Sequence, residues 1–549
     1  MKSGFTALSL AALLSLSVGA AADGEKEHHD AIKGQLFSPE SSTSEGSVTV
    51  EGSSVDYHAV AGTLVVHQKG YDDSLQKSGD GDADKSDAKD TKDKKDAGDE
   101  SNPNAEASMF YVAYFKDGVP ARARPITFVY NGGPGSASMW LHMGAFGPRR
   151  IITADNSHTP AAPYRLVDNA YSLMDASDLV FIDAPGTGFS RIAGKDKEKA
   201  FFGVDPDVHA FAEFITQFLS VYDRWNSPKY LFGESYGTPR SAALVNVLET
   251  QYDTDFNGVI LLSQILNYDL ATGRANYNPG VDLPFELALP TYAATAWYHH
   301  KLPDYSGPVE PLIQEVEQFA LNEYAQALDQ GANLSPSDRD AIAEKLHRYT
   351  GLPVDYIKKA NLRIDGGEFE KTLQADQDLT TGRLDTRFLG PTLDPLSESS
   401  EYDPQSAAIS SAYVSAFNAY VRDSLHFGAG KTYKPSASTY RTWDFHHQPP
   451  GVPFPVPQAM NVMPDLANAM KYNPDLKVLL NAGYYDLATP FFEGVYEMQH
   501  LQIPPNLQSN ISFKFYQSGH MVYAHEESLK TLHDNVAEFI LQTDNVRGE

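Results

Sequence analysis

The stretch that decides the fold is Tyr230-Leu231-Phe232-Gly233-Glu234-Ser235-Tyr236-Gly237, in a chain of 549 residues. An apolar run typical of a strand leads into Gly-Glu-Ser-Tyr-Gly, and a helix-like segment with Ala242, Leu244 and Leu248 follows. Strand, G-x-S-x-G and helix together form a nucleophile elbow, in which glycines permit a tight turn and the serine hydroxyl stands clear of the backbone. The alternative is a glycine-flanked turn whose serine caps a helix. The context favours Ser235 as a nucleophile.

Outward from this stretch, short apolar runs alternate with helical ones, as in a parallel sheet. The runs are Ile126 to Tyr130, Leu179 to Ile182, Tyr230 to Phe232 and Val259 to Leu262, with a helix predicted over Val208 to Tyr222. The alternation lapses after residue 268, where helices are predicted over Pro311 to Leu328 and from Ser335 to Gly351. It resumes at Lys477 to Leu480 and Ile511 to Phe515, and a last helix covers Glu527 to Leu541. The pattern predicts an α/β-hydrolase fold, with a mostly parallel central sheet and an inserted helical cap.

The domain boundaries follow from shifts in composition. We interpret residues 1–22 as a signal peptide, because a basic start, an apolar run and an A-x-A-like site follow one another. A flexible leader covers 23–45, and the α/β domain comprises 46–268 and 441–549, with 269–440 as the cap. Residues 77–108 are predicted to be a disordered acidic insertion within a hairpin. The acidic run Asp80 to Asp84 lacks the glycine that a calcium loop needs at its sixth position.

Charge and cysteine content exclude several functions. The net charge of −29 argues against binding to nucleic acid or an anionic membrane, because both attract positive charge. No later apolar run is long enough to span a membrane, so no membrane span is expected once the signal is removed. The chain has no cysteine, which excludes disulfides and thiolate metal sites. An export signal without disulfides fits a bacterial periplasm, and we expect a periplasmic or extracellular protein.

A serine hydroxyl needs an imidazole to take its proton, and the imidazole needs a carboxylate to orient it. In α/β hydrolases the acid and then the histidine follow the serine along the chain. Asp486 and His520 come directly after the two last predicted strands, at the sheet edge where active sites gather. We therefore expect Ser235, Asp486 and His520 to form a catalytic triad.

An acyl-transfer site also needs donors aimed at the developing oxyanion. The glycine-rich loop Asn131-Gly132-Gly133-Pro134-Gly135 directly follows a predicted strand. A loop in this place supplies one backbone N–H and Tyr236, after the nucleophile, supplies the other. The alternative, a phosphate-binding loop, lacks both G-x-G-x-x-G and a following Gly-Lys-Ser.

Five blocks in order resemble the serine carboxypeptidases, peptidase family S10. They are NGGPGSAS at 131–138, NAYSLMDASDLVFIDAPGTGFS at 169–190, GESYG at 233–237, the GYYD segment ending at Asp486, and SGHM at 518–521. The resemblance covers most of 108–268 and 440–541. It implies removal of residues from the carboxyl ends of peptides or proteins through an acyl-enzyme, with no metal and no organic cofactor.

The resemblance also implies a role for each site residue. Ser235 would be the nucleophile, His520 the base and Asp486 its partner, and the N–H groups of Gly133 and Tyr236 would form the oxyanion hole. The terminal carboxylate of the substrate would be held by Asn131, the N–H of Gly132 and Glu234. Because a carboxylate opposes a carboxylate, one of the two must share a proton, which favours activity in mild acid.

The sequence departs from the family at Ala145, where members usually carry a second glutamate. Recognition of the terminal carboxylate is therefore expected to be weaker or to use a cation such as Arg149 or His142. Ser136 also replaces a usual cysteine. The aromatic residues Trp140, Tyr292 and Trp297 either line a substrate pocket or pack within the cap.

Other readings of the sequence remain open. The alternative activities are those of an esterase or acyltransferase on the same fold, and a second alternative is a catalytically silent binding protein. The pairs His299-His300 and His446-His447 are not expected to bind metal, because neighbouring residues on a helix do not face one ligand.

Overall fold

The computed structural model describes residues 36–72, 104–273, 278–455 and 459–546. The predicted signal peptide and most of the leader and of the acidic insertion lie outside these residues. A bilayer-crossing helix needs a long apolar stretch, and none of the helices in the described part of the chain has one.

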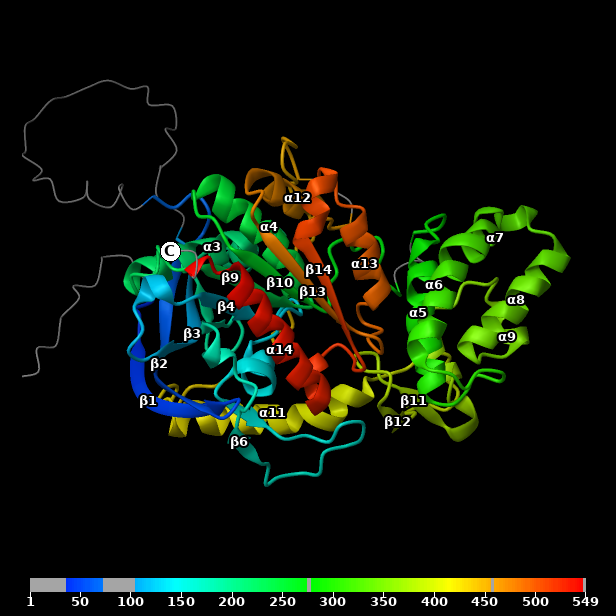
Figure 1. The fold of residues 1–549 in the computed structure, drawn as a ribbon, viewed down its shortest axis with the longest axis horizontal. Helices are drawn as coiled ribbons and strands as arrows, with labels where there is room; N and C mark the ends of the chain where they lie inside the picture. The colour runs from blue at the N-terminus through cyan, green and yellow to red at the C-terminus, as the bar shows by residue number, and fades with distance from the viewer. Residues whose placement is uncertain (1–35, 73–103, 274–277, 456–458, 547–549) are drawn as a thin grey trace, which may run out of the picture. The chain divides into compact units, whose positions relative to one another are not determined.

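A ten-stranded sheet forms the centre of the fold, in the order β1-β2-β3-β7-β4-β9-β10-β13-β14, with β8 paired to β3 (Figure 1). The six strands from β7 to β14 in this order are parallel, and β1, β2 and β3 extend one edge in antiparallel pairs. The strands are β1 (Ser41–Val50), β2 (Ser53–His67), β3 (Glu106–Lys116), β4 (Ile126–Tyr130), β7 (Asp178–Ile182), β8 (Arg191–Ala193), β9 (Lys229–Glu234), β10 (Gly258–Leu262), β13 (Lys477–Gly483) and β14 (Ile511–Tyr516).

Helices cover both faces of the sheet because successive residues of each buried strand point to opposite sides. Leu231 and Leu261 belong to one core with α3 (Val204–Val221), α4 (Gly237–Gln251) and α12 (Met463–Tyr472). Phe232 and Leu262 belong to the other core, with α14 (Glu526–Thr543), α11 (Pro404–Asp423) and η3 (His142–Phe146). Both cores are built from buried apolar side chains, which is why the strands read as continuous apolar runs.

The strand order reverses between β4 and β9. The chain passes from β4 outward to β7 and then returns across β4 to form β9. Loops at such a switch point leave the sheet in opposite directions, and a crevice opens at the carboxyl ends of the strands. The glycine-rich loop after β4 and Ser235 after β9 both lie at this position.

The helical cap has its own apolar core, and Figure 1 shows α5 to α9 gathered into a lobe next to α13 (Phe491–Gln499). Its helices are α5 (Leu283–Tyr298), α6 (Val309–Phe319), α7 (Ala325–Asp329), α8 (Pro336–Thr350), α9 (Val354–Lys359) and α10 (Gly366–Thr372). The helix predicted from Ser335 to Gly351 is confirmed: the Ser335 side chain accepts a hydrogen bond from Asp338 N, and Gly351 ends the helix with φ of 69°. The π-helical turn η6 (Ala320–Tyr324) joins α6 to α7, so the other predicted cap helix continues through it.

Small elements complete the structure. They are β5 (Arg149–Ile151), β6 (Leu166–Asp168), β11 (Leu379–Thr381), β12 (Leu389–Pro391), α1 (Met139–Leu141) and α2 (Lys197–Phe201). The pair β11 and β12 is antiparallel and connects the cap helices to α11.

Three of the segment boundaries predicted from the sequence differ from those in the structure. β1 begins at Ser41, inside the range assigned to the leader. Its polar sequence reflects an edge strand in which exposed residues alternate with half-buried ones and, at Val48 and Val50, with buried ones. β3 begins at Glu106, so the predicted insertion ends too late by several residues. α11 lies in the range assigned to the cap, but Ile409 and Phe417 pack in the core of the α/β domain.

Candidate active site

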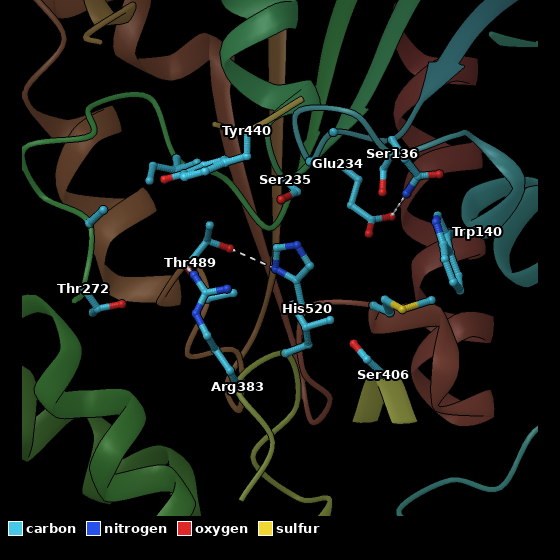
Figure 2. Close-up of a pocket in the computed structure, with 18 of the residues that line it drawn as sticks. Ser136, Trp140, Glu234, Ser235, Thr272, Arg383, Ser406, Tyr440, Thr489 and His520 are labelled. Atoms are coloured by element: carbon cyan, nitrogen blue, oxygen red, sulfur yellow. Dashed lines mark hydrogen bonds between the residues drawn. The ribbon is translucent and has the colours of Figure 1, made fainter. Parts of the chain in front are cut away.

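A cavity of about 910 Å³ opens at the carboxyl ends of β4, β9, β13 and β14 (Figure 2). All three residues of the predicted triad lie at this end of the sheet, and Ser235 and His520 line the cavity directly. Apolar side chains from α11 and from the segment after β11, Ile409 and Leu384, line it as well. The cavity is therefore walled by both parts of the discontinuous α/β domain and by the end of the inserted segment.

Ser235 occupies a strained turn between β9 and α4. Its φ is 59°, in the left-handed region that residues with a side chain rarely adopt. The turn is held by Ser235 N, which donates to Leu262 O at 3.0 Å, and by Thr238 N, which donates to Ser235 O at 2.8 Å. A Cβ on Gly233 would lie 2.1 Å from Gly237 O, so the turn can close only with glycine at 233.

His520 is oriented by a buried carboxylate. Its Nδ1 lies 2.8 Å from Asp486 Oδ2 and 3.2 Å from Thr489 Oγ1. Asp486 Oδ1 accepts the backbone N–H groups of Ala488 and Thr489 at 2.9 and 3.0 Å, and Oδ2 accepts the Thr489 hydroxyl at 2.8 Å. Burial opposes the charged imidazolium, but the charge and hydrogen bond of Asp486 outweigh it, and the pKa of His520 is raised.

The imidazole ring of His520 points toward Ser235 (Figure 2). Since Nδ1 is engaged by Asp486, Nε2 is the nitrogen available on the side of Ser235. No hydrogen bond joins the Ser235 hydroxyl to His520 in this structure, where both are described. The hydroxyl, the imidazole and the carboxylate are thus brought together in the predicted order, with the serine exposed to the cavity.

Two backbone N–H groups are candidates for the oxyanion hole: Tyr236 directly follows Ser235 in the chain, and Gly133 lines the same cavity. A Cβ on Gly132 would lie 2.3 Å from Tyr236 N, which shows how closely the glycine-rich loop passes the start of α4. Gly133 continues this loop with φ of 107°, a conformation suited to glycine. Among the described residues, neither Gly133 N nor Tyr236 N has a hydrogen-bond acceptor, so both donors remain available to a ligand.

Glu234 lies beside Ser235 with its carboxyl group facing the cavity (Figure 2). Its Oε2 accepts hydrogen bonds from Asn131 Nδ2 at 3.0 Å and from the Tyr523 hydroxyl at 2.8 Å. Burial raises the pKa of Glu234 to about 7, although these donors and the nearby His520 oppose the shift. Both hydrogen bonds from the protein end on Oε2. The other oxygen, Oε1, is therefore the atom that can hold the proton of the neutral carboxyl group and donate it to a ligand in the cavity.

The two cations considered in place of a second glutamate do not reach the cavity. His142 is buried, its Nε2 lies 2.7 Å from the Tyr114 hydroxyl, and burial lowers its pKa to about 3. Arg149 forms an ion pair with Asp168 at 2.8 Å. Ala145 itself is buried, and its carbonyl accepts Asn169 Nδ2 at 2.7 Å. The expectation that Arg149 or His142 serves the substrate carboxylate is therefore wrong.

The aromatic residues divide between the two roles considered for them. Trp140 and Ser136 line the cavity beside Glu234 (Figure 2). Tyr292 packs in the cap core and donates its hydroxyl to Ile364 O at 3.1 Å. Trp297 packs against the same core and donates Nε1 to Gly307 O at 2.8 Å.

Three residues of the site were missed from the sequence. Thr489 bonds both Asp486 and His520, Tyr523 bonds Glu234, and Arg383 lines the cavity from the segment between β11 and β12. For Thr489 a signal existed, because an aspartate commonly accepts backbone N–H groups two and three residues later. No local pattern marks Tyr523 or Arg383.

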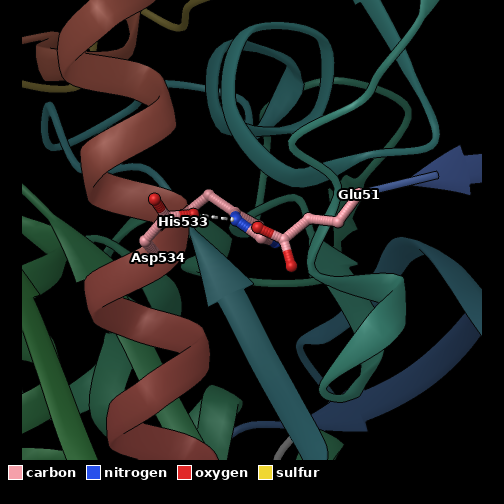
Figure 3. Close-up of side chains that lie close together, drawn as sticks. All are labelled: Glu51, His533 and Asp534. Carbon is pink, nitrogen blue, oxygen red and sulfur yellow. Dashed lines mark hydrogen bonds and ion pairs between the residues drawn. The ribbon is translucent and has the colours of Figure 1, made fainter. Parts of the chain in front are cut away.

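A separate group of potential metal ligands, Glu51, His533 and Asp534, has ligand atoms within 4.8 Å of one another (Figure 3). His533 Nδ1 lies 2.9 Å from Asp534 Oδ1, and its Nε2 lies 3.2 Å from Asp175 Oδ2. Both ring nitrogens are thus engaged by carboxylates, and the group forms an ion-pair cluster. His447 is similarly placed between Asp205 and Asp465, and these carboxylates raise its pKa to about 9 against the effect of burial.

The chain is similar in sequence to several known proteins. The carboxypeptidase Y homolog of Arthroderma benhamiae is 32% identical over 141 residues, which cover 25% of this chain and 26% of the relative. The serine carboxypeptidase ctsa-3.2 of Caenorhabditis elegans is 24% identical over 184 residues, 31% of this chain and 33% of the relative. The alignments therefore span about a quarter to a third of these relatives. Among solved structures, the proline iminopeptidase of Mycobacterium smegmatis is 12% identical, with a TM-score of 0.32 over 80% of this chain and 96% of that one.

The family model described as serine carboxypeptidase, peptidase family S10, matches residues 99–531. The match covers most of the chain and contains the glycine-rich loop, the nucleophile elbow and the segments of Asp486 and His520. The fold is an α/β-hydrolase fold, and the chain belongs to the serine carboxypeptidase family of hydrolases.

Proposed function

We propose that this protein is an exported carboxypeptidase that removes the last residue of peptides or proteins through an acyl-enzyme. Ser235 Oγ attacks the carbonyl carbon of the last peptide bond while His520 Nε2 takes the hydroxyl proton. The C–N bond then breaks, and the same proton passes to the departing amine. Water deacylates Ser235 with His520 again acting as the base, and Asp486 stabilises the imidazolium in both halves of the reaction.

The developing oxyanion is stabilised by the N–H groups of Gly133 and Tyr236. Both groups lack an acceptor among the described residues, Tyr236 directly follows Ser235, and Gly133 lines the same cavity. Preorganised donors of this kind contribute roughly 3 kcal/mol each to acyl-transfer catalysis. Thr489 serves as a positioning residue, because its hydroxyl contacts both Asp486 and His520.

The observation that carries the choice of carboxypeptidase over esterase is the carboxyl group of Glu234 beside the nucleophile. With a pKa of about 7 and an unbonded Oε1, it is a donor to a substrate carboxylate when protonated. Asn131 and the N–H of Gly132 complete this subsite. A simple ester has no carboxylate at this place and would leave the subsite unused.

The test compares an N-blocked dipeptide with its carboxyl-amidated form. We expect wild type to release the last residue of the free acid at least about tenfold faster, as kcat/KM, because a charge-assisted hydrogen bond is lost with the amide. Ser235→Ala should abolish release. Equal cleavage of both forms would contradict the assignment of the carboxylate subsite, and hydrolysis of simple esters without any peptide cleavage would favour the esterase.

The location of the protein is part of the proposal. The amino-terminal basic, apolar and small-residue zones and the lack of cysteine support export to a periplasm or the medium. Expression of the full chain in a bacterial host should yield a periplasmic or secreted form beginning near Asp23. An unprocessed protein retained in the cytoplasm would contradict export.

A further inference from the structure

Arg383 is a fixed positive charge in the cavity of an otherwise acidic protein. The charged residues of the cavity lining are Glu234, Arg383 and His520, and only the arginine is cationic at every physiological pH. Its side chain is exposed, whereas Glu234 and His520 are buried. The guanidinium is therefore the group that a substrate anion in the cavity would meet in charged form.

A backbone hydrogen bond fixes the position of Arg383, whereas its side chain makes few contacts with the protein. Arg383 N donates to Asp403 Oδ1 at 2.8 Å, and Asp403 also caps α11. The side chain makes one long contact, from Nη2 to Ala488 O at 3.5 Å. Among the described residues no carboxylate lies within ion-pair distance of Arg383. A guanidinium has five N–H donors, so most of its capacity is unused.

Arg387, four residues later in the chain, differs from Arg383 because its guanidinium forms ion pairs with carboxylates of the protein. Its Nη2 lies 2.7 Å from Asp385 Oδ2 and its Nη1 lies 3.2 Å from Asp155 Oδ1. Its side chain is buried, and it does not line the cavity. The same segment therefore carries one arginine that is paired with carboxylates inside the protein and one that lines the cavity and forms no ion pair with a described residue.

Arg383 and the Glu234 subsite lie on opposite sides of the reacting groups. Figure 2 shows Arg383 and Thr489 to one side of Ser235 and His520, and Glu234 and Trp140 to the other. In the proposed function, on which this inference rests, the departing amino acid occupies the side of Glu234. The residue that becomes the acyl group then extends to the side of Arg383.

We propose that Arg383 binds the carboxylate side chain of the penultimate residue, so that substrates with Asp or Glu before the scissile bond are preferred. Arginine and carboxylate match in geometry through two parallel hydrogen bonds. The neighbouring Leu384 and Ala488 provide apolar contact for the methylene groups of the substrate side chain.

The test uses N-blocked dipeptides that end in the same residue and carry Glu, Gln or Lys before it. We expect wild type to prefer Glu over Gln by roughly tenfold in kcat/KM. Arg383→Gln should bring this ratio close to one, and Arg383→Glu should shift preference to Lys. Arg122→Gln makes the same charge change at an exposed position outside the cavity, and should keep the wild-type ratio.

Two results would overturn the proposal. One is an unchanged ratio of Glu to Gln in Arg383→Gln with the fold intact by circular dichroism. The other is an equal loss on all three peptides together with loss of discrimination against the amidated form, which would assign Arg383 to the terminal carboxylate. Cleavage of the Gln peptide by wild type tests the proposed function independently, and if wild type cleaves none of the peptides both proposals fail.

Discussion

At the scale of single residues, the protonation of Glu234 decides how the cavity meets a carboxylate. Burial raises its pKa to about 7, so the group is a neutral donor below this pH and an anion above it. In the proposed function the substrate carboxylate is ionised throughout, so we expect its attraction to the Glu234 subsite to weaken as pH rises through 7. Under the proposed function, mildly acidic conditions are therefore expected to favour binding, even though Ala145 stands where the family resemblance implies a second glutamate.

The direction of this pH dependence of binding can be measured separately from catalysis. In Ser235→Ala, the Kd of an N-blocked dipeptide acid should rise by up to about tenfold per pH unit above 7, as followed by titration calorimetry. Adding Glu234→Gln should flatten this dependence, because an amide does not ionise. If both proteins lose affinity in parallel, His520 and not Glu234 carries the pH dependence.

The residues with a sequence signal were those whose chemistry depends on the local chain. Ser235 is flanked by glycines that its turn requires, and Asp486 and His520 follow strands that end at one edge of the sheet. Tyr523 and Arg383 reach the site only because the fold places them beside segments far along the chain, at Glu234 and Ala488. Such contacts exist only after folding, so a single sequence gives no pattern for them.

At the scale of elements, a buried histidine joins the β1–β2 turn region to α14. His533 on α14 is 2% exposed and pairs with Asp534 on its own helix (Figure 3). It also pairs with Asp175, the last residue of the 3-10 helix η4 (Leu173–Asp175) before β7. Burial disfavours the charged ring, but the hydrogen bonds and charges of the two aspartates outweigh it, and the pKa of His533 is raised. Glu51 in the turn adds a further carboxylate to the cluster.

A raised pKa means that the folded protein binds the proton more tightly than the unfolded chain. The stabilisation from His533 is therefore fully present below about pH 6.5, the unfolded value, and is lost as pH rises through the folded pKa. His533→Gln lacks the stabilisation that the protonated histidine contributes. Its difference in Tm from wild type should therefore be largest near pH 6 and shrink toward pH 9. Thermal unfolding by scanning calorimetry measures it, and a difference that grows with pH would refute the ion-pair interpretation.

The periodic elements were predictable, but the core that each one joins was not. The apolar positions of α8 and its caps identify the helix from sequence alone. α11 shows a similar apolar face, yet that face packs on the α/β domain and not on the cap. Periodicity shows that a helix buries one side, and only the three-dimensional path of the chain decides against which partner.

At the scale of the whole molecule, the net charge of −29 opposes the local charge of Arg383. An acidic peptide is repelled at long range by the protein and attracted at short range by the guanidinium. Salt screens the first effect strongly, because the Debye length falls to about 10 Å at 0.1 M, and screens a contact inside the cavity less.

Raising ionic strength from about 0.01 to 0.1 M should therefore increase kcat/KM for the Glu peptide and decrease it for the Lys peptide. Arg383→Gln should keep both salt trends, since the field of the whole molecule hardly changes when one charge is removed. Initial rates at low substrate concentration measure this directly. A kcat/KM for the Glu peptide that falls with salt in wild type, but not in Arg383→Gln, would mean that the arginine and not the net charge controls the approach of the substrate.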